Sequence, residues 1–160
     1  NPTVNSYKRI NAPVTDSGAT WSPNTITYSD NNRTHMIRVP GSGRFELRLM
    51  DGATNPYLLQ AGIIAAGIDG IENNRNPGKP SFLNMYAEAH KAKSAKKLPK
   101  NLETALSHLS KSKVMNKAFS KETINSYVKL RSLDIKDFKK SKDSKKKGIT
   151  EWEKLNTLDC

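Results

Sequence analysis

The stretch NNRTHMIRVPGSGRFELRLMDG, residues 31 to 52, holds the densest cluster of arginines in this chain. Between positions 33 and 48 lie four of the seven arginines and a single acid. These residues are Arg33, Arg38, Arg44 and Arg48, with Glu46 as the acid. Arginine carries a planar fork of donors that suits carboxylate and phosphate oxygens. The crowding therefore indicates charges that are placed for a purpose.

The same stretch has the pattern of two β-strands, His35 to Val39 and Phe45 to Met50. Residues Pro40 to Gly43 between them have the composition of a hairpin turn. In the second strand apolar and charged residues alternate, so that one face is apolar and the other reads Arg-Glu-Arg. A shorter strand is predicted from Thr25 to Tyr28, and residues 1–24 are predicted to be loop.

Downstream of the strands the hydrophobic pattern becomes helical. Asn55 suits an N-cap and Pro56 suits the first helical position, which predicts a helix over about 56–73. Further helices are predicted over about 101–119 and 121–138. The residues of the first helix that we expect to face a core are Leu58, Leu59, Ile63, Ala66 and Ile71. The predicted fold class is α+β, with short antiparallel strands over about 25–50 followed by helices.

The net charge of +12 is unevenly distributed along the 160 residues. Residues 1–80 carry +2 and residues 81–160 carry +10, mostly as lysine. The run from Lys139 to Lys147 is the one feature that favours a nucleic-acid partner. It lacks interleaved arginines and aromatics, so we interpret it as a solvated segment and do not expect nucleic-acid binding.

Several other classes of protein are excluded by what the sequence lacks. Its longest apolar run, Ala61 to Ile68, is far shorter than the roughly 20 residues of a membrane span. One cysteine, Cys160, cannot form an internal disulfide. His35 is expected to be structural, and His90 and His108 have no metal-ligand spacing around them. We expect a cytoplasmic protein of one domain, and a start at Asn1 suggests a piece of a longer chain.

The Arg-Glu-Arg face allows two interpretations. An edge strand often carries a charged outer face whose ion pairs contribute little to stability. Alternatively, Glu46 is a ligand of Mg²⁺, which takes one or two carboxylates together with substrate phosphates, and the arginines neutralise those phosphates. Arg33 and Arg38 are five positions apart, so a bulge or a strand end is needed for both to reach one site.

Four blocks, in order, resemble the C-terminal part of the catalytic domain of the glutamine synthetase family. They are NPTVNSYKR (1–9), NNRTHMIRVP (31–40), RFELRLMDGATNPYL (44–58) and AAGIDGIENNRNPG (65–78). A later block, NMYAEAHKAKSAKKLPKNLETAL (84–106), also fits. GATWSP (18–23) and the terminal TLDC resemble the type III-like branch, which is similar to the γ-glutamylmethylamide synthetases.

The resemblance implies a ligase that activates the glutamate side chain with ATP and Mg²⁺ or Mn²⁺ and then joins γ-glutamyl phosphate to an amine. Ammonia as the amine gives glutamine, and methylamine is the alternative. The site residues follow by position. Glu46 matches the metal ligand, Arg38 and Arg44 match arginines on the ATP phosphates, Arg33 matches the arginine near the transferred phosphoryl group, and Arg9 and Arg48 match the arginines that bind glutamate.

Two departures from the family pattern bear on the acceptor and on the basic cluster. Trp21 stands where the family has a flap glutamate beside the ammonia site, which makes a small alkylamine a credible acceptor. A basic residue before the Arg44 strand is replaced by the turn from Gly41 to Gly43.

The resemblance also implies a homo-oligomer at full length, because the family builds its site between subunits. The 160-residue chain alone is therefore expected to be inactive. A non-catalytic basic binding module and a catalytically dead homologue remain as alternatives.

Overall fold

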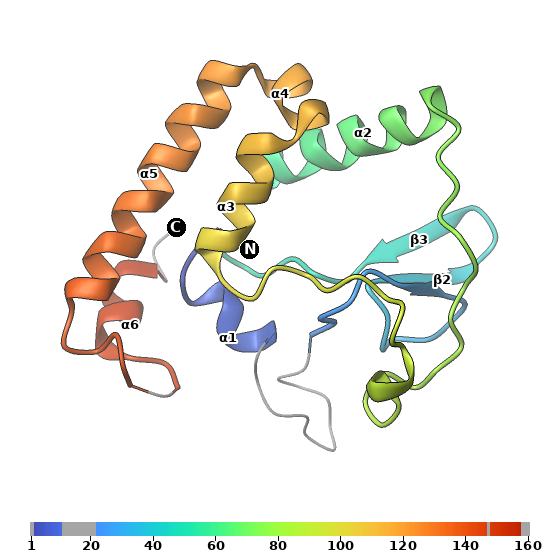
Figure 1. Ribbon diagram of the computed structural model, residues 1–160, viewed down its shortest axis with the longest axis horizontal. Helices are drawn as coiled ribbons and strands as arrows, with labels where there is room; N and C mark the ends of the chain where they lie inside the picture. Colours follow the sequence, from blue (N-terminus) through green and yellow to red (C-terminus); the bar gives the residue numbers. More distant parts are fainter. Residues whose placement is uncertain (1, 11–21, 147, 158–160) are drawn as a thin grey trace. The chain divides into compact units, whose positions relative to one another are not determined.

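The computed structural model describes residues 2–10, 22–146 and 148–157 (Figure 1). Its elements fall into two compact units. The helical unit comprises Asn1–Tyr7, Asp51–Pro77 and Asn101–Cys160, and the sheet unit comprises Lys8–Met50 and Gly78–Lys100. This is an α+β chain, as predicted.

The sheet unit contains three short strands in the order β1-β2-β3: β1 (Tyr28–Ser29), β2 (Ile37–Gly41) and β3 (Arg44–Leu47). Strands β2 and β3 are antiparallel, as predicted, but β1 and β2 are parallel. The prediction of a purely antiparallel sheet was therefore wrong. The reason lies in the connection between β1 and β2, whose side chains bond to residues 83–85 instead of closing a hairpin.

The predicted hairpin between β2 and β3 is confirmed. Gly41 pairs with Arg44 across a two-residue turn, and Gly43 adopts a φ of 79°, which glycine tolerates without strain. The pairing register shifts between Arg38 and Gly41. Such an irregularity bends a strand locally and re-aims the side chains beside it.

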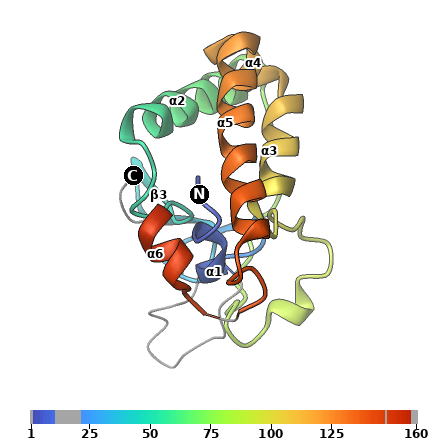
Figure 2. The same cartoon turned by 90° about the vertical axis from the view of Figure 1, so that its left-hand side faces the viewer.

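The helical unit is built from α2 (Pro56–Glu72), α3 (Leu102–Lys111), α4 (Lys113–Phe119), α5 (Lys121–Lys140) and α6 (Glu151–Thr157). Helices α3 and α5 lie side by side (Figure 2). Their buried side chains, Leu102, Leu106 and Ile124, are each no more than 5% exposed and form the core of this unit. Two short elements complete the chain, α1 (Ser6–Ile10) and the 3₁₀-helix η1 (Ala89–Lys91).

The single helix predicted over 101–119 is instead two helices, α3 and α4. They are divided at Ser112, whose backbone is extended and whose hydroxyl accepts a hydrogen bond from the amide of Met115 at 3.3 Å. A serine side chain that bonds to a backbone amide at a helix N-terminus competes with the hydrogen bonds of a continuous helix. Ser112 therefore ends α3 and begins α4. The helix predicted to end at 138 continues to Lys140, and α1 falls within the region predicted to be loop.

Helix α2 begins as predicted, with the Asn55 side chain accepting a hydrogen bond from the amide of Leu58 at 3.0 Å. Its apolar residues do not form a core, however. No residue of α2 is buried, and Ile71 is 80% exposed. Helix α4 packs on α2, and Met115 of α4 lies close to Gly62 of α2. No helix in the described part of the chain is long and apolar enough to cross a membrane.

Candidate functional site

The candidate site is centred on one ion pair between neighbouring strands of the sheet unit. Arg38 on β2 stands directly opposite Glu46 on β3. Residues opposite each other on paired strands share a face of the sheet. The Arg38 Nη1 atom donates a hydrogen bond to Glu46 Oε1 at 2.6 Å. The Arg38 side chain is 12% exposed and that of Glu46 is 41% exposed, so the pair offers its carboxylate to solvent.

Arg38 is held from its other edge by Asn31, which precedes β2. The Asn31 Oδ1 atom accepts a hydrogen bond from Arg38 Nε at 2.9 Å and a second one from Nη2. The guanidinium is therefore fixed between an amide oxygen and a carboxylate. Asn31 was not predicted as a site residue, since one asparagine in a loop gives no signal of its partner.

The Glu46 carboxylate sits in a positive environment. The hydrogen bond from Arg38 is the main cause that lowers its pKa, and the charges of Arg38, Arg48 and Arg33 lower it further. Partial burial acts in the opposite direction and is outweighed. Glu46 is consequently ionised at neutral pH, the state that a cation ligand requires.

Arg48 differs from the other arginines of the cluster in how its donors are satisfied. Its Nε atom lies 3.9 Å from Glu46 Oε2, and its Nη1 atom is buried with no hydrogen-bond partner among the described residues. Burial lowers the pKa of the Arg48 guanidinium, while Glu46 and the nearby Tyr86 oppose that shift. A buried donor without an acceptor is costly. An anionic ligand beside Arg48 would remove that cost.

Arg33 and Arg44 occupy different surroundings. Arg33 lies in the turn before β2, is exposed, and is close enough to influence the pKa of both Glu46 and Arg48. Strand β2 begins at Ile37, so Arg33 lies before the strand. The alternation of side chains along a strand therefore does not force Arg33 onto the face opposite Arg38. Arg44 opens β3 and is exposed. No hydrogen bond or ion pair joins its side chain to another described residue, so its role stays a prediction.

Two residues singled out from the sequence have side chains outside the described part of the structure. Arg9 belongs to α1, but its side chain lies outside the described residues. Trp21, which stands at the flap position, also lies outside them. The structure thus brings together Arg33, Arg38, Glu46 and Arg48, and the proximity of Tyr86 to Arg48 was not foreseen.

Glu46 fits one ligand position of a divalent-metal site. Mg²⁺ is bound in many enzymes by one or two carboxylates together with substrate phosphates and waters. The described residues contain no group of three or more histidine, cysteine or acidic side chains that could hold a metal ion. A metal at Glu46 would therefore need other oxygen ligands, such as phosphates, beside this carboxylate.

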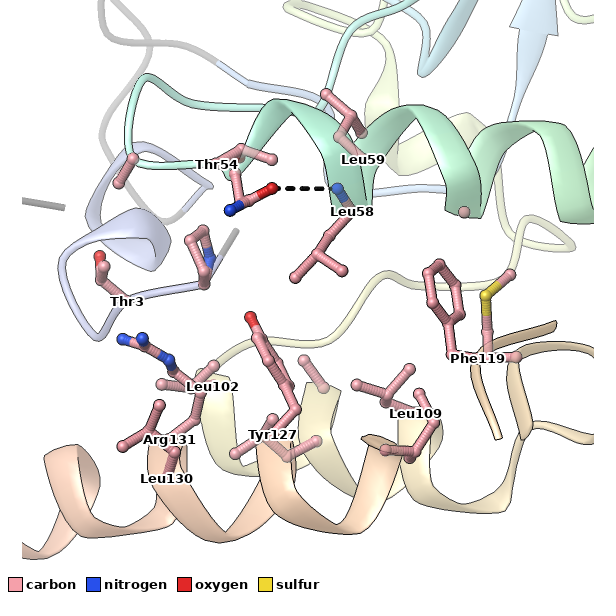
Figure 3. Close-up of a pocket in the computed structure, with 18 of the residues that line it drawn as sticks. Thr3, Thr54, Leu58, Leu59, Leu102, Leu109, Phe119, Tyr127, Leu130 and Arg131 are labelled. Carbon is pink, nitrogen blue, oxygen red and sulfur yellow. Dashed lines mark hydrogen bonds between the residues drawn. The ribbon is translucent and has the colours of Figure 1, made fainter. Parts of the chain in front are cut away.

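A cavity of about 800 Å³ lies within the helical unit and contains none of the predicted site residues. Figure 3 shows Leu58 of α2 and Tyr127 of α5 entering it from opposite walls. Its lining is mainly apolar and includes no acidic residue. Arg131, the charged lining residue, donates a hydrogen bond to Asp134 at 2.9 Å and lies over the Tyr127 ring at 5.8 Å. Arg131 Nε is buried without a hydrogen-bond partner among the described residues, but the lining has no carboxylate that could hold a metal ion.

A hairpin that surrounds one ionised carboxylate with arginines defines a class of anion-binding site suited to phosphates and carboxylates. Residues 1–153 match the family described as glutamine synthetase, catalytic domain. The chain belongs to that family.

Individual relatives carry two different names. The chain is 54% identical to a glutamine synthetase of Rhizobium leguminosarum bv. phaseoli over 99% of its own length. It is 39% identical to a glutamate–methylamine ligase of Methyloversatilis universalis, also over 99% of its length. A solved structure described as a GmaS/ADP complex matches 100% of the chain at a TM-score of 0.81 and 51% identity. The chain spans only 35% of the Rhizobium protein and 35% of that solved chain.

Proposed function

We propose that the protein that carries this chain is an ATP-dependent ligase that forms an amide on the glutamate side chain through γ-glutamyl phosphate. The observation that carries the proposal is the Arg38–Glu46–Arg48 arrangement, with a buried Arg48 donor that lacks an acceptor among the described residues. Phosphoryl transfer depends mainly on positioning and charge neutralisation, and this is what such an arrangement supplies. The family assignment supports the same reaction class.

In the proposed site each charged side chain has a stated ligand. Arg48, together with Arg9, binds the glutamate substrate. Arg38 and Arg44 contact the phosphates of ATP, and Arg33 stabilises the charge that develops on the transferred phosphoryl group. Glu46 holds one divalent metal ion, Mg²⁺ or Mn²⁺. When bound, that ion neutralises charge on the phosphate oxygens.

The Arg38–Glu46 pair has a specific task in this arrangement. Arg38 holds Glu46 Oε1 at 2.6 Å, while Oε2 lies 3.9 Å from Arg48 and makes no close contact with it. One carboxylate oxygen is thus available for a cation while the other is oriented by the protein. Asn31 completes the support, because it fixes the guanidinium that orients the carboxylate.

Ammonia is the leading acceptor, and methylamine is the second candidate. The relatives support both, since a glutamine synthetase and a glutamate–methylamine ligase match almost the whole chain. Trp21 at the flap position favours methylamine, because an acid that would attract an ammonium ion is missing there. We also propose that the complete protein is a cytoplasmic homo-oligomer and that the chain alone has no turnover.

The reaction is tested in a chimera in which this chain replaces the matching third of the Rhizobium leguminosarum glutamine synthetase. Phosphate release from ATP is followed with glutamate and Mg²⁺, with ammonia or methylamine as the acceptor and the unmodified host as the control. Turnover with either amine supports the ligase, and the faster amine identifies the acceptor. A correctly assembled chimera that is inactive with both amines contradicts the proposal.

The basic binding module is the alternative of a different class. Within the lysine-rich segment, Lys146 pairs with Asp143, and Lys139 pairs with Glu103. These pairs are typical of a solvated surface. Binding of the chain to duplex DNA that falls steeply with salt and is lost when the lysines of 139–147 are changed would favour this alternative.

A further inference from the structure

His35 is the most deeply buried histidine of the described chain, with an exposure of 0%. Its Nε2 atom lies 2.9 Å from the carbonyl oxygen of Leu83, and its Nδ1 atom lies 2.9 Å from Thr27 Oγ1. A carbonyl can only accept, so Nε2 carries the hydrogen. In the neutral ring Nδ1 is then the acceptor and the Thr27 hydroxyl is the donor. The ring therefore links two segments that are distant in sequence.

The residues on the two sides of Arg33 bond to the same distant segment. Asn32 Nδ2 donates to the carbonyl of Leu83 at 3.1 Å, beside the bond from His35. Thr34 Oγ1 accepts from the amide of Met85 at 3.0 Å. Met85 is itself buried, with an exposure of 3%. Residues 83–85 thus clamp the backbone immediately before and after Arg33.

Asn32 and Thr34 are also hydrogen-bonded to each other. The Asn32 Oδ1 atom accepts from the Thr34 amide at 2.9 Å and from the Thr34 hydroxyl at 2.7 Å. Thr34 and His35 are buried, whereas Arg33 between Asn32 and Thr34 is exposed. The fold therefore fixes the backbone of a turn while it presents one cation outward, close to Glu46 and Arg48.

We propose that His35 is a positioning residue for Arg33, acting through its hydrogen bond to the carbonyl of Leu83. It does not touch substrate. Without this bond the 83–85 segment loses one of its three hydrogen bonds to the turn, beside those of Asn32 and Thr34, and the turn from which Arg33 reaches the transferred phosphoryl group becomes less rigid. This inference rests on the proposed ligase function.

Two substitutions separate the two hydrogen bonds of the ring. In His35→Gln the amide nitrogen occupies the place of Nε2 and can still donate to Leu83. In His35→Asn the amide occupies the place of Nδ1, so the bond to Thr27 is retained and the bond to Leu83 is lost. Each variant removes one hydrogen bond of a buried ring, so both are expected to lower thermal stability.

The variants are compared in the Rhizobium chimera, well below their melting temperatures. We expect H35N to lower kcat about 10-fold to 100-fold, since a misplacement of about 1 Å can cost about 100-fold. The KM for glutamate should stay near that of the parent, because Arg48 is not part of the clamp. H35Q should retain most of the parental kcat. Equal kcat values for H35N, H35Q and the parent, with lower melting temperatures alone, would show that His35 is merely structural.

Binding of tripolyphosphate to the same chimeras keeps this test independent of turnover. The variant R33A, which lacks the guanidinium, measures the largest loss of tripolyphosphate affinity that misplacement of Arg33 could cause. We expect H35N to approach that loss and H35Q to resemble the parent. A parent that binds tripolyphosphate but does not turn over counts against the ligase and still tests His35. H35N binding equal to that of the parent overturns the inference, and a parent that shows neither activity nor binding overturns both proposals.

Discussion

Arg38 and Glu46 face each other across the β2–β3 pair, and their side chains meet at 2.6 Å. The partner of Glu46 is thus a cross-strand arginine. Arg44, two residues away on the same strand, makes no ion pair with it. A cross-strand bond ties the geometry of the charge cluster to the register of the hairpin.

Loss of the Glu46 charge should impair turnover severely. In the chimera we expect E46Q to lower kcat/KM about 100-fold or more, because a group that helps to stabilise developing charge is typically worth about 3–4 kcal/mol. The Mg²⁺ concentration needed for half-maximal activity should rise as well. Phosphate release measured over a series of Mg²⁺ concentrations tests both effects.

Asp69 offers a matched control for E46Q, because it is also a carboxylate paired with an arginine. It bonds to Arg75 at the end of α2, outside the arginine cluster. We expect D69N to leave kcat/KM and the Mg²⁺ requirement close to those of the parent. Equal losses in E46Q and D69N would argue that Glu46 has no special role.

Arg48 should determine the affinity for glutamate. The substitution R48K keeps a positive charge but removes the buried Nη1 donor. We expect the KM for glutamate to rise at least about 10-fold, since a hydrogen bond to a charged group is worth about 1.5–3 kcal/mol. Arg75 is exposed, so R75K serves as the control. Steady-state kinetics with glutamate as the varied substrate measures the change, and an unaltered KM would remove Arg48 from the glutamate site.

Stability of the chain should depend on the α3–α5 core and not on the outer face of α2. Leu106 is 5% exposed, and L106A should lower the free energy of unfolding by about 2–5 kcal/mol. Ile71 is 80% exposed, so I71A should change it by no more than about 0.5 kcal/mol. Urea unfolding of the 160-residue chain and its two variants provides the measurement. A large effect of I71A would mean that another surface covers α2.

Tyr7 should make the chain sensitive to alkali. Burial, together with Tyr127 and Asp51, raises the pKa of the Tyr7 hydroxyl to about 12 from 10.0. The folded chain therefore keeps this proton at a pH where the unfolded chain releases it. Its contribution is fully present below pH 10.0 and is lost as the pH rises toward about 12.

The expected loss is roughly 2–3 kcal/mol over that interval, since each pKa unit corresponds to about 1.4 kcal/mol. The free energies of unfolding of the chain and of Y7F are compared between pH 9 and pH 12. The lysines titrate in both proteins, so the difference between the two gives the contribution of the Tyr7 hydroxyl. An identical pH dependence in both proteins would contradict the assignment to Tyr7.

Features that depend on a few neighbouring residues were predictable from the amino-acid sequence. The Gly-Ser-Gly turn produced the hairpin, Asn55 capped α2, and the crowding of arginines around Glu46 marked the candidate site. These outcomes follow from local backbone preference and from short side-chain hydrogen bonds. The glutamine synthetase family was also recognisable from short blocks of residues.

Features that depend on partners far apart in the chain were decided by tertiary structure. Glu46 bonds to Arg38 because the strand register places them opposite each other. The parallel pairing of β1 and the burial of His35 both depend on a segment about 50 residues downstream, around Leu83. No local propensity encodes such a partner. Burial and hydrogen bonding select it only when the segments have come together, and this explains why a histidine that was unremarkable in sequence became the centre of the clamp around Arg33.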